Sequence, residues 1–315
     1  MKSSSVINKI ISWLGLFFFV LAIYMIYRQL SKYTMSELKD AILNIPHKNL
    51  FYALIASLLG YIALSTYDYL ALKYIKKKLQ SWKWVLTGFI GFSVSNNAGH
   101  AIVSGGAVRY RFYSRWGFKP GDIVKMITFS GFTYLIACFF LIIVGYVMTP
   151  EQAYGGSNTT KLSTLITTIL SVVGLGLYFW ASLYYKKSFT IKGIKFRMPK
   201  FRLAIEQMLI GSIDIVMASL VLYSVLICFI EIDFMTFMGA YIIAQVLGVY
   251  SQVPGGLGVF ELVFSNVLPG QENQAILFGA LIAYRIIYYL LPLLISGIVL
   301  FIYEYIKADE KLEEA

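Results

Sequence analysis

Hydrophobic residues along this chain gather into long continuous runs and do not alternate with polar residues. A helix that crosses a bilayer needs about 20 consecutive apolar residues. Six runs are long enough, and we expect spanning helices at 8–28, 49–72, 122–149, 161–185, 203–230 and 275–305. No small-residue cleavage site follows the first run, so we interpret it as a retained span and not as a signal peptide. The pattern predicts an all-α polytopic membrane protein with about six full transmembrane helices.

Two further apolar segments, 84–116 and 233–268, are interrupted by glycine. Gly and Pro destabilise a helix interior by roughly 1 and 3 kcal/mol. The interruptions are therefore predicted hinges, and they read Ser104-Gly105-Gly106 and Pro254-Gly255-Gly256-Leu257-Gly258. Arms of about 10–14 residues are too short to span a bilayer but suit a re-entrant hairpin. The alternative is that the Gly-Gly pairs only permit close helix packing.

Composition and charge agree with this pattern. Apolar residues make up 58% of the chain and charged residues 14%, against roughly 45–50% and 25% in soluble domains. The net charge is +11, but the basic residues lie between apolar segments, where they set topology and contact anionic headgroups. Nucleic acid is therefore not an expected partner. Cys138 and Cys228 both lie inside apolar runs, and no metal-binding spacing occurs, so we predict no metal, cofactor or disulfide framework.

The basic loops also predict the orientation in the membrane. Clusters at 73–83, 109–125 and 186–202 should be cytoplasmic, whereas 150–160, 231–233 and 268–274 lack basic residues and should face outward. These sides agree only if both broken segments are re-entrant, the first from the cytoplasm and the second from outside. Both chain termini are then cytoplasmic. One conflict is that a basic loop at 28–48 must lie outside.

The two halves of the chain share one order of elements, namely span, span, broken hairpin, span. Residues 1–150 and 151–306 are the predicted repeats, and 307–315 form a cytoplasmic tail. The two Gly-Gly breaks are 150 residues apart, and Tyr134 and Tyr284 keep the same offset. Three full crossings per half give the halves opposite orientations. Inverted repeats with paired broken helices are typical of transporters that bind substrate near the midplane.

Charged side chains at membrane depth are costly and usually face a bundle interior or cavity. The candidate binding residues are Asp68, Arg109, Arg111, Glu206, Asp214, Glu261 and Arg285. Arg109 and Arg111 follow the first Gly-Gly, so we expect them in the opening turns of a half-helix. Its unpaired N–H groups and the guanidinium forks suit a phosphate. The alternative is that both are ordinary cytoplasmic topology charges.

Several alternatives remain for the other charges. Asp68 can pair with Lys73 or Lys76, and Glu206 with Arg202 one turn away. Glu206 and Asp214, eight residues apart, should share one helix face.

Positions 111 and 261 are equivalent in the two halves and opposite in charge, which suggests a salt bridge between the hairpins, as a gate or a structural lock. Arg285 needs a phosphate or a carboxylate such as Glu261 or Asp214. Asn96, Asn97 and His100 precede the first break. They can contact a headgroup or satisfy backbone groups that the break exposes. No nucleophile or metal set accompanies His100, so no catalytic residues are predicted.

Three stretches together resemble a known family. They are Gly105-Gly106-Ala107-Val108-Arg109-Tyr110-Arg111-Phe112-Tyr113-Ser114-Arg115, Gln252-Val253-Pro254-Gly255-Gly256-Leu257-Gly258-Val259-Phe260-Glu261, and Ala283-Tyr284-Arg285 with Pro292. They are similar to the lysylphosphatidylglycerol synthase transmembrane family, in particular its stand-alone inner-membrane members of the YbhN type. The resemblance covers nearly the whole chain. It implies a lipid translocase, with functional positions at Asp68, Arg109, Glu206, Glu261 and Arg285. Two-domain members carry a separate soluble domain for aminoacyl transfer, which we do not expect in this chain.

The leading hypothesis is therefore a flippase-like translocase of the bacterial cytoplasmic membrane. Its expected partners are the membrane and an anionic or aminoacylated phospholipid, and it is not expected to be an enzyme. One rival is a secondary transporter of a small polar solute. Another is a non-transporting scaffold that recruits a lipid-modifying enzyme. The sequence indicates neither the lipid, nor the coupling ion, nor the oligomeric state.

Overall fold

The structure is a computed structural model that describes residue 36 and residues 43–98, 101–148, 158–251, 253–268 and 274–313. The predicted span 8–28 lies outside these residues. The first-half elements are α3 (His47–Ile75), α4 (Ser81–Ala98), α5 (Ala101–Arg115) and α6 (Pro120–Met148). They are followed by α7 (Asn158–Tyr184), β1 (Ser188–Ile191), β2 (Ile194–Arg197), α8 (Phe201–Leu226), α9 (Phe234–Tyr250), η1 (Pro254–Gly256), α10 (Val259–Val267), α11 (Gln274–Tyr284), η2 (Arg285–Leu290) and α12 (Leu291–Glu313).

Five stretches of the described residues are helical, long and apolar enough to cross a membrane. They are His47–Ile75, Pro120–Met148, Thr164–Tyr184, Phe201–Leu226 and Gly279–Lys307. Each coincides with one of the predicted runs, which confirms the helical membrane fold. Large apolar side chains such as Leu170 and Trp180 on α7 are exposed. In a membrane protein such a surface faces lipid tails, so its exposure needs no soluble partner.

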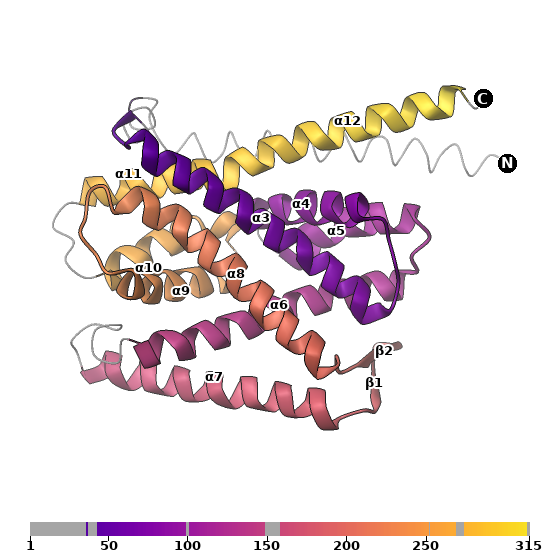
Figure 1. The fold of residues 1–315 in the computed structure, drawn as a ribbon, viewed down its shortest axis with the longest axis horizontal. Helices are drawn as coiled ribbons and strands as arrows, with labels where there is room; N and C mark the ends of the chain where they lie inside the picture. Colours follow the sequence, from indigo (N-terminus) through magenta and orange to yellow (C-terminus); the bar gives the residue numbers. More distant parts are fainter. Residues whose placement is uncertain are drawn as a thin grey trace.

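Helices α3 and α8 lie side by side at the centre of the bundle (Figure 1). Small residues allow the close approach of neighbouring helices. A Cβ atom on Gly211 of α8 would lie 2.6 Å from the Cβ atom of Ala137, and one on Gly88 of α4 would lie 2.7 Å from the Cα atom of Ser65. Close contacts through glycine are the usual means of helix association in lipid, where no hydrophobic force drives helices together.

A short antiparallel hairpin of β1 and β2 joins α7 to α8, with Ser188 opposite Arg197. Its two-residue turn, Lys192 and Gly193, has φ of 48° and 78°, as a hairpin turn with two left-handed residues requires. The sequence analysis expected only a basic loop here. In the part of the chain that the structure describes, strands occur only in this connection, and the apolar segments are helical.

The two broken segments fold as helical hairpins that open toward opposite ends of the bundle, and the turn η1 of the second contacts α4 of the first (Figure 1). The α4–α5 hairpin opens toward the end that carries the basic α3–α4 loop and the β-hairpin. The α9–α10 hairpin opens toward the other end, beside the α8–α9 connection. This opposite placement accords with an inverted repeat, which stays a prediction, as does the membrane depth that each hairpin reaches.

The predicted break at Gly105 and Gly106 is wrong. Helix α5 begins at Ala101 and continues through both glycines to Arg115. The reason is helix packing, the alternative that the sequence left open. A Cβ atom on Gly105 would collide with the Ser95 hydroxyl and would lie 3.0 Å from the carbonyl oxygen of Gly91. Gly105 therefore lets α5 lie directly against α4.

The second predicted break is confirmed. Pro254–Gly256 forms the 3-10 turn η1 between α9 and α10. Gly255, Gly256 and Gly258 have φ of 61°, 62° and 83°. An L side chain in this left-handed region is strained, whereas glycine adopts it freely. The chain direction at this break therefore depends on these glycines.

Gly105→Ala is expected to lower the free energy of unfolding by about 1–3 kcal/mol, because the added methyl group overpacks the α4–α5 contact. Gly106→Ala is the matched control. Its Cβ atom would lie 3.3 Å from the flexible end of Ile127, and alanine favours a helix interior by roughly 0.5–1 kcal/mol over glycine. Thermal unfolding of both variants in detergent measures the difference. Equal losses would show that Gly105 has no special packing role.

Candidate functional site

The first buried ion pair joins α3 to α5. The Arg109 Nε atom donates to Asp68 Oδ1 at 2.8 Å, and the Tyr113 hydroxyl donates to Asp68 Oδ2 at 2.9 Å. Asp68 is completely buried and Arg109 is 3% exposed. Arg109 and Tyr113 are four residues apart and so project from one face of α5. The alternative pairing of Asp68 with Lys73 or Lys76 is wrong, because Arg109 and Tyr113 of α5 bind both carboxylate oxygens.

Part of the Arg109 fork remains available. Its guanidinium carbon lies 4.3 Å from the centre of the Phe92 ring. Two glycines leave room for the Nη1 atom of Arg109. A Cβ atom on Gly91 or Gly105 would lie 3.3 or 3.1 Å from Nη1. The Nη2 atom is buried and makes no hydrogen bond within the described part of the chain. A guanidinium has five N–H donors and can bind a second anion with those that Asp68 leaves.

The expected helix N-terminus at this arginine is wrong. Arg109 lies eight residues after the first residue of α5, and Arg111 lies ten residues after it. The macrodipole acts mainly within the first turn of a helix. The anion-binding capacity of this site therefore comes from the guanidinium and not from free backbone N–H groups.

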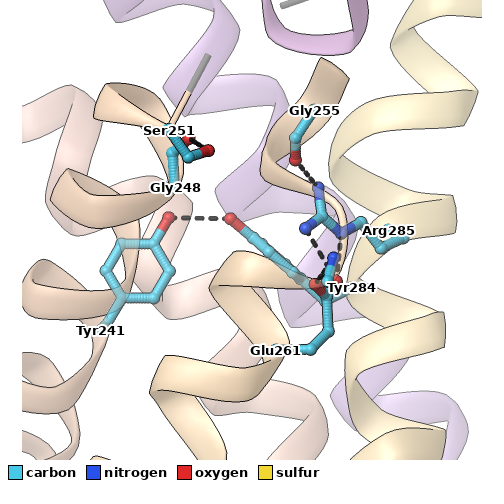
Figure 2. Close-up of polar contacts among 8 residues, drawn as sticks. Tyr241, Gly248, Ser251, Gly255, Glu261, Tyr284 and Arg285 are labelled. Carbon is cyan, nitrogen blue, oxygen red and sulfur yellow. Dashed lines mark hydrogen bonds and ion pairs between the residues drawn. The ribbon is translucent and has the colours of Figure 1, made fainter. Parts of the chain in front are cut away.

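The second buried ion pair lies at the α10 end of the second hairpin (Figure 2). Arg285 donates from Nε to Glu261 Oε1 at 2.8 Å, and its Nη2 atom lies 2.7 Å from the same oxygen. Its Nη1 atom donates to the Gly255 carbonyl. Glu261 Oε2 in turn accepts from the Gly258 N–H at 2.7 Å. Of the two carboxylates predicted for Arg285, Glu261 is confirmed and Asp214 is wrong.

This arrangement makes the break and the ion pair one unit. Glu261 satisfies an N–H group at the start of α10, where a negative charge is also favourable. Arg285 donates a hydrogen bond to the Gly255 carbonyl group in η1, the turn that precedes α10. The position of η1 is thus fixed by a charged pair, 3% and 6% exposed, whose partners come from two helices.

Arg111 contributes to a different contact. Its Nη2 atom lies 2.8 Å from Glu304 Oε1 on α12, and Arg115 makes two contacts with the same carboxylate, at 2.7 and 3.2 Å. The predicted bridge between Arg111 and Glu261 is therefore wrong, because Arg111 pairs with Glu304 and Glu261 pairs with Arg285. Glu304 was not among the residues predicted from the sequence. It could have been recognised as an acidic residue inside the last apolar run, 275–305.

Glu206 and Asp214 both face α3, as their spacing predicted. Glu206 pairs with Arg202 at 3.5 Å and with the Lys73 ammonium group, and it is partly exposed. Asp214 is buried and accepts hydrogen bonds from Tyr67 at 2.9 Å and Tyr288 at 3.3 Å. Within the described part of the chain, neither acid forms a hydrogen bond or ion pair with Arg109 or Arg285, so these predicted site residues do not form one cluster.

The π-helical segment η2 is held by side chains of the first half. Ser57 and Tyr61 of α3 donate to the carbonyls of Ile287 and Tyr288 at 3.2 and 3.1 Å. Asn97 of α4 donates to the next carbonyl, that of Tyr289, at 3.1 Å. One of the two predicted roles of Asn97 was to satisfy backbone groups at the first break. Asn97 does bind a backbone carbonyl, but this carbonyl belongs to η2. His100 lies outside the described residues. π-Helical turns often occur at functional sites, and this one begins at Arg285.

The fold and these contacts define the class of protein. It is a multi-pass helical membrane protein with two helical hairpins, and each hairpin holds one member of a buried arginine–carboxylate pair. The model of the family described as lysylphosphatidylglycerol synthase TM region matches residues 12–296. The chain therefore belongs to this family, which confirms the resemblance seen in its motifs.

Individual relatives agree. An uncharacterized protein of Synechocystis sp., slr0712, is 33% identical over 284 residues, which cover 89% of this chain and 87% of the relative. The inner membrane protein YbhN of Escherichia coli is 28% identical over 92% of this chain and 90% of its own length. A phosphatidylglycerol lysyltransferase of Staphylococcus xylosus is 29% identical over 88% of this chain, but only 32% of that enzyme is covered.

Proposed function

We propose that this protein moves an anionic or aminoacylated phospholipid between the leaflets of a bacterial cytoplasmic membrane. Several observations support the proposal. The family is described by lysylphosphatidylglycerol synthase, and some relatives are named for lysyl transfer to phosphatidylglycerol. The fold is a membrane fold, and the Escherichia coli relative is named an inner membrane protein. The basic loops at one end of the bundle support a cytoplasmic position for that end and for the end of α12.

The observation that carries the proposal is the buried Arg109 guanidinium. Arginine is costly inside a membrane and usually marks a substrate path or a cavity. Asp68 neutralises its charge, yet Nη2 has no hydrogen-bond partner among the described residues. A lipid phosphate can accept from that N–H and compete with Asp68 for the rest of the fork. A cationic aminoacyl headgroup would find the Asp68 carboxylate in the same place.

The second pair offers the same chemistry in the second half of the chain. Glu261 belongs to the hairpin that opens in the opposite direction, and Arg285 belongs to the π-helical segment η2. In this proposal the headgroup exchanges with one pair and then with the other, and the two hairpins open in turn. Alternating movement of paired broken elements is the general mode of inverted-repeat transporters.

Leaflet translocation in proteoliposomes tests the proposal. Fluorescent phosphatidylglycerol, lysylphosphatidylglycerol and zwitterionic phosphatidylcholine are compared by their accessibility to an external quencher. We expect the first two lipids to exchange between leaflets faster than the third. The Arg109→Ala variant should slow this exchange at least about tenfold, because a hydrogen bond to a charged group contributes about 1.5–3 kcal/mol.

Arg202→Ala is the matched control, because that arginine is 94% exposed and pairs only at 3.5 Å. It should leave exchange unchanged. If folded wild-type protein moves none of the three lipids, the translocase proposal is wrong. Uptake of a small polar solute, or activity only with a lipid-modifying enzyme present, would then be measured as the rival functions.

A further inference from the structure

Asp214 is a buried carboxylate that forms no ion pair within the described part of the chain. It is 4% exposed, and its two oxygens accept only from the hydroxyl groups of Tyr67 and Tyr288. The buried arginines Arg109, Arg111 and Arg285 are bound to other acids. Asp214 therefore differs from Asp68 and Glu261, each of which has a guanidinium partner.

An ionised carboxylate without a cation is costly in an apolar interior, by several kcal/mol. A carboxylic acid avoids this cost, because it is neutral. Both neighbours fit either state, since a tyrosine hydroxyl can donate to a carboxylate or accept from the protonated acid. The hydrogen bonds therefore allow both states, but the cost of an unpaired buried charge favours the protonated acid in the packing that the structure shows.

Within the described part of the chain, no free positive charge faces Asp214. The charged side chains Asp68 and Lys73 of α3 and Arg285 of η2 are bound to Arg109, Glu206 and Glu261. The hydroxyl and thiol groups on the elements packed on α8 include Tyr61 and Tyr67 of α3, Tyr134 and Cys138 of α6, Tyr178 of α7, Tyr241 of α9, Tyr284 of α11 and Tyr288 of η2. Tyr241 and Tyr284 bond to each other (Figure 2), and Tyr178 bonds to Gln207. All eight are neutral near pH 7 at their ordinary pKa values. Loss of the proton would therefore leave an uncompensated charge between α3 and α8.

The position of Asp214 connects it to both ion pairs. Tyr67 directly precedes Asp68 on α3, and Tyr288 follows Arg285 by three residues in η2. The carbonyls of η2 are in turn held by Ser57 and Tyr61 of α3. Any separation of α3 from α8 or η2 that hydrates Asp214 would displace one member of each pair. A single protonation site can thus act on both hairpins.

We propose that Asp214 binds and releases one proton in each transport cycle, and that this step couples lipid movement to the proton gradient. The inference rests on the proposed function. The neutral acid belongs to the closed packing. When that packing opens, the acid gives its proton to water and becomes a carboxylate, and closure follows the uptake of a proton from water on the other side of the membrane.

The experiment uses the full chain in proteoliposomes with the membrane potential clamped and a pH difference of one unit imposed. Fluorescent phosphatidylglycerol reports the ratio between leaflets at steady state. One proton per lipid predicts a ratio of about tenfold, because a unit of pH corresponds to about 1.4 kcal/mol. Asp214→Asn should bring the ratio to about one, and Asp214→Glu should restore part of the response. Asp122→Asn, a surface carboxylate beside Lys77 and Lys125, should behave as wild type.

A second measurement does not depend on transport. The infrared difference spectrum between acidic and alkaline pH should contain the band of a buried protonated carboxyl group, and Asp214→Asn should remove it. Wild-type protein that moves lipid with a ratio unaffected by the pH difference, or that follows a sodium gradient instead, overturns the inference. Absence of the infrared band does so too. Wild-type protein that moves no lipid but shows the band contradicts the proposed function and leaves the proton site established.

Discussion

Arg109→Ala is expected to lower the free energy of unfolding by about 3–5 kcal/mol in addition to its effect on transport. The substitution leaves the Asp68 carboxylate buried with the Tyr113 hydroxyl as its remaining partner. Removing one member of a buried ion pair has this cost because the other charge is uncompensated. A loss of transport in this variant alone would therefore not distinguish a binding role from a structural one.

The double variant Arg109→Met, Asp68→Asn separates these roles. It removes both charges and keeps the side-chain volume and an acceptor for Tyr113. Replacing a whole buried pair is often neutral for stability, so we expect the unfolding temperature in detergent to return close to that of wild type. Lipid exchange should stay at the low level of Arg109→Ala. Recovery of exchange together with stability would show that the guanidinium does not bind the headgroup.

The spans were predictable because the signal is one-dimensional. A run of about 20 apolar residues needs no knowledge of its neighbours, and α3, α6 and α8 follow the predicted runs closely. The break at Pro254 was predictable for a similar reason. Proline excludes the regular helix, and three nearby glycines permit positive φ. Both properties belong to the residues themselves.

Gly105 shows the limit of such reasoning. A glycine in an apolar segment can break a helix or let another helix approach, and the choice depends on Ser95 and Gly91 on the facing helix. The ion pairs have the same limit. Asp68 and Arg109 are 41 residues apart, whereas Lys73 is near in sequence but points to Glu206. The candidate charges were recognisable from their cost in lipid, but their partners depend on which helices are adjacent.

In the Arg285–Glu261 pair, hydrogen bonds to the backbone determine which position must be the acid and which the arginine. Position 261 must accept a hydrogen bond from the Gly258 N–H, and position 285 must donate one to the Gly255 carbonyl. An arginine has no acceptor, and a carboxylate has no donor when it is ionised. The exchanged variant Glu261→Arg, Arg285→Glu would keep the net charge and an ion pair, yet it would leave both backbone groups of the break unsatisfied.

We therefore expect the exchanged variant to be as unstable as either single variant, by about 3–5 kcal/mol, and to move no lipid. Glu261→Gln should be milder, because its amide oxygen still accepts from Gly258. Arg285→Lys should be severe, because one ammonium group cannot reproduce the planar fork that reaches Glu261 and Gly255. Unfolding temperature and lipid exchange, measured on the same preparations, test this order. If the exchanged variant recovers both, charge alone holds the pair together, and the geometry of the break does not fix which residue is the arginine.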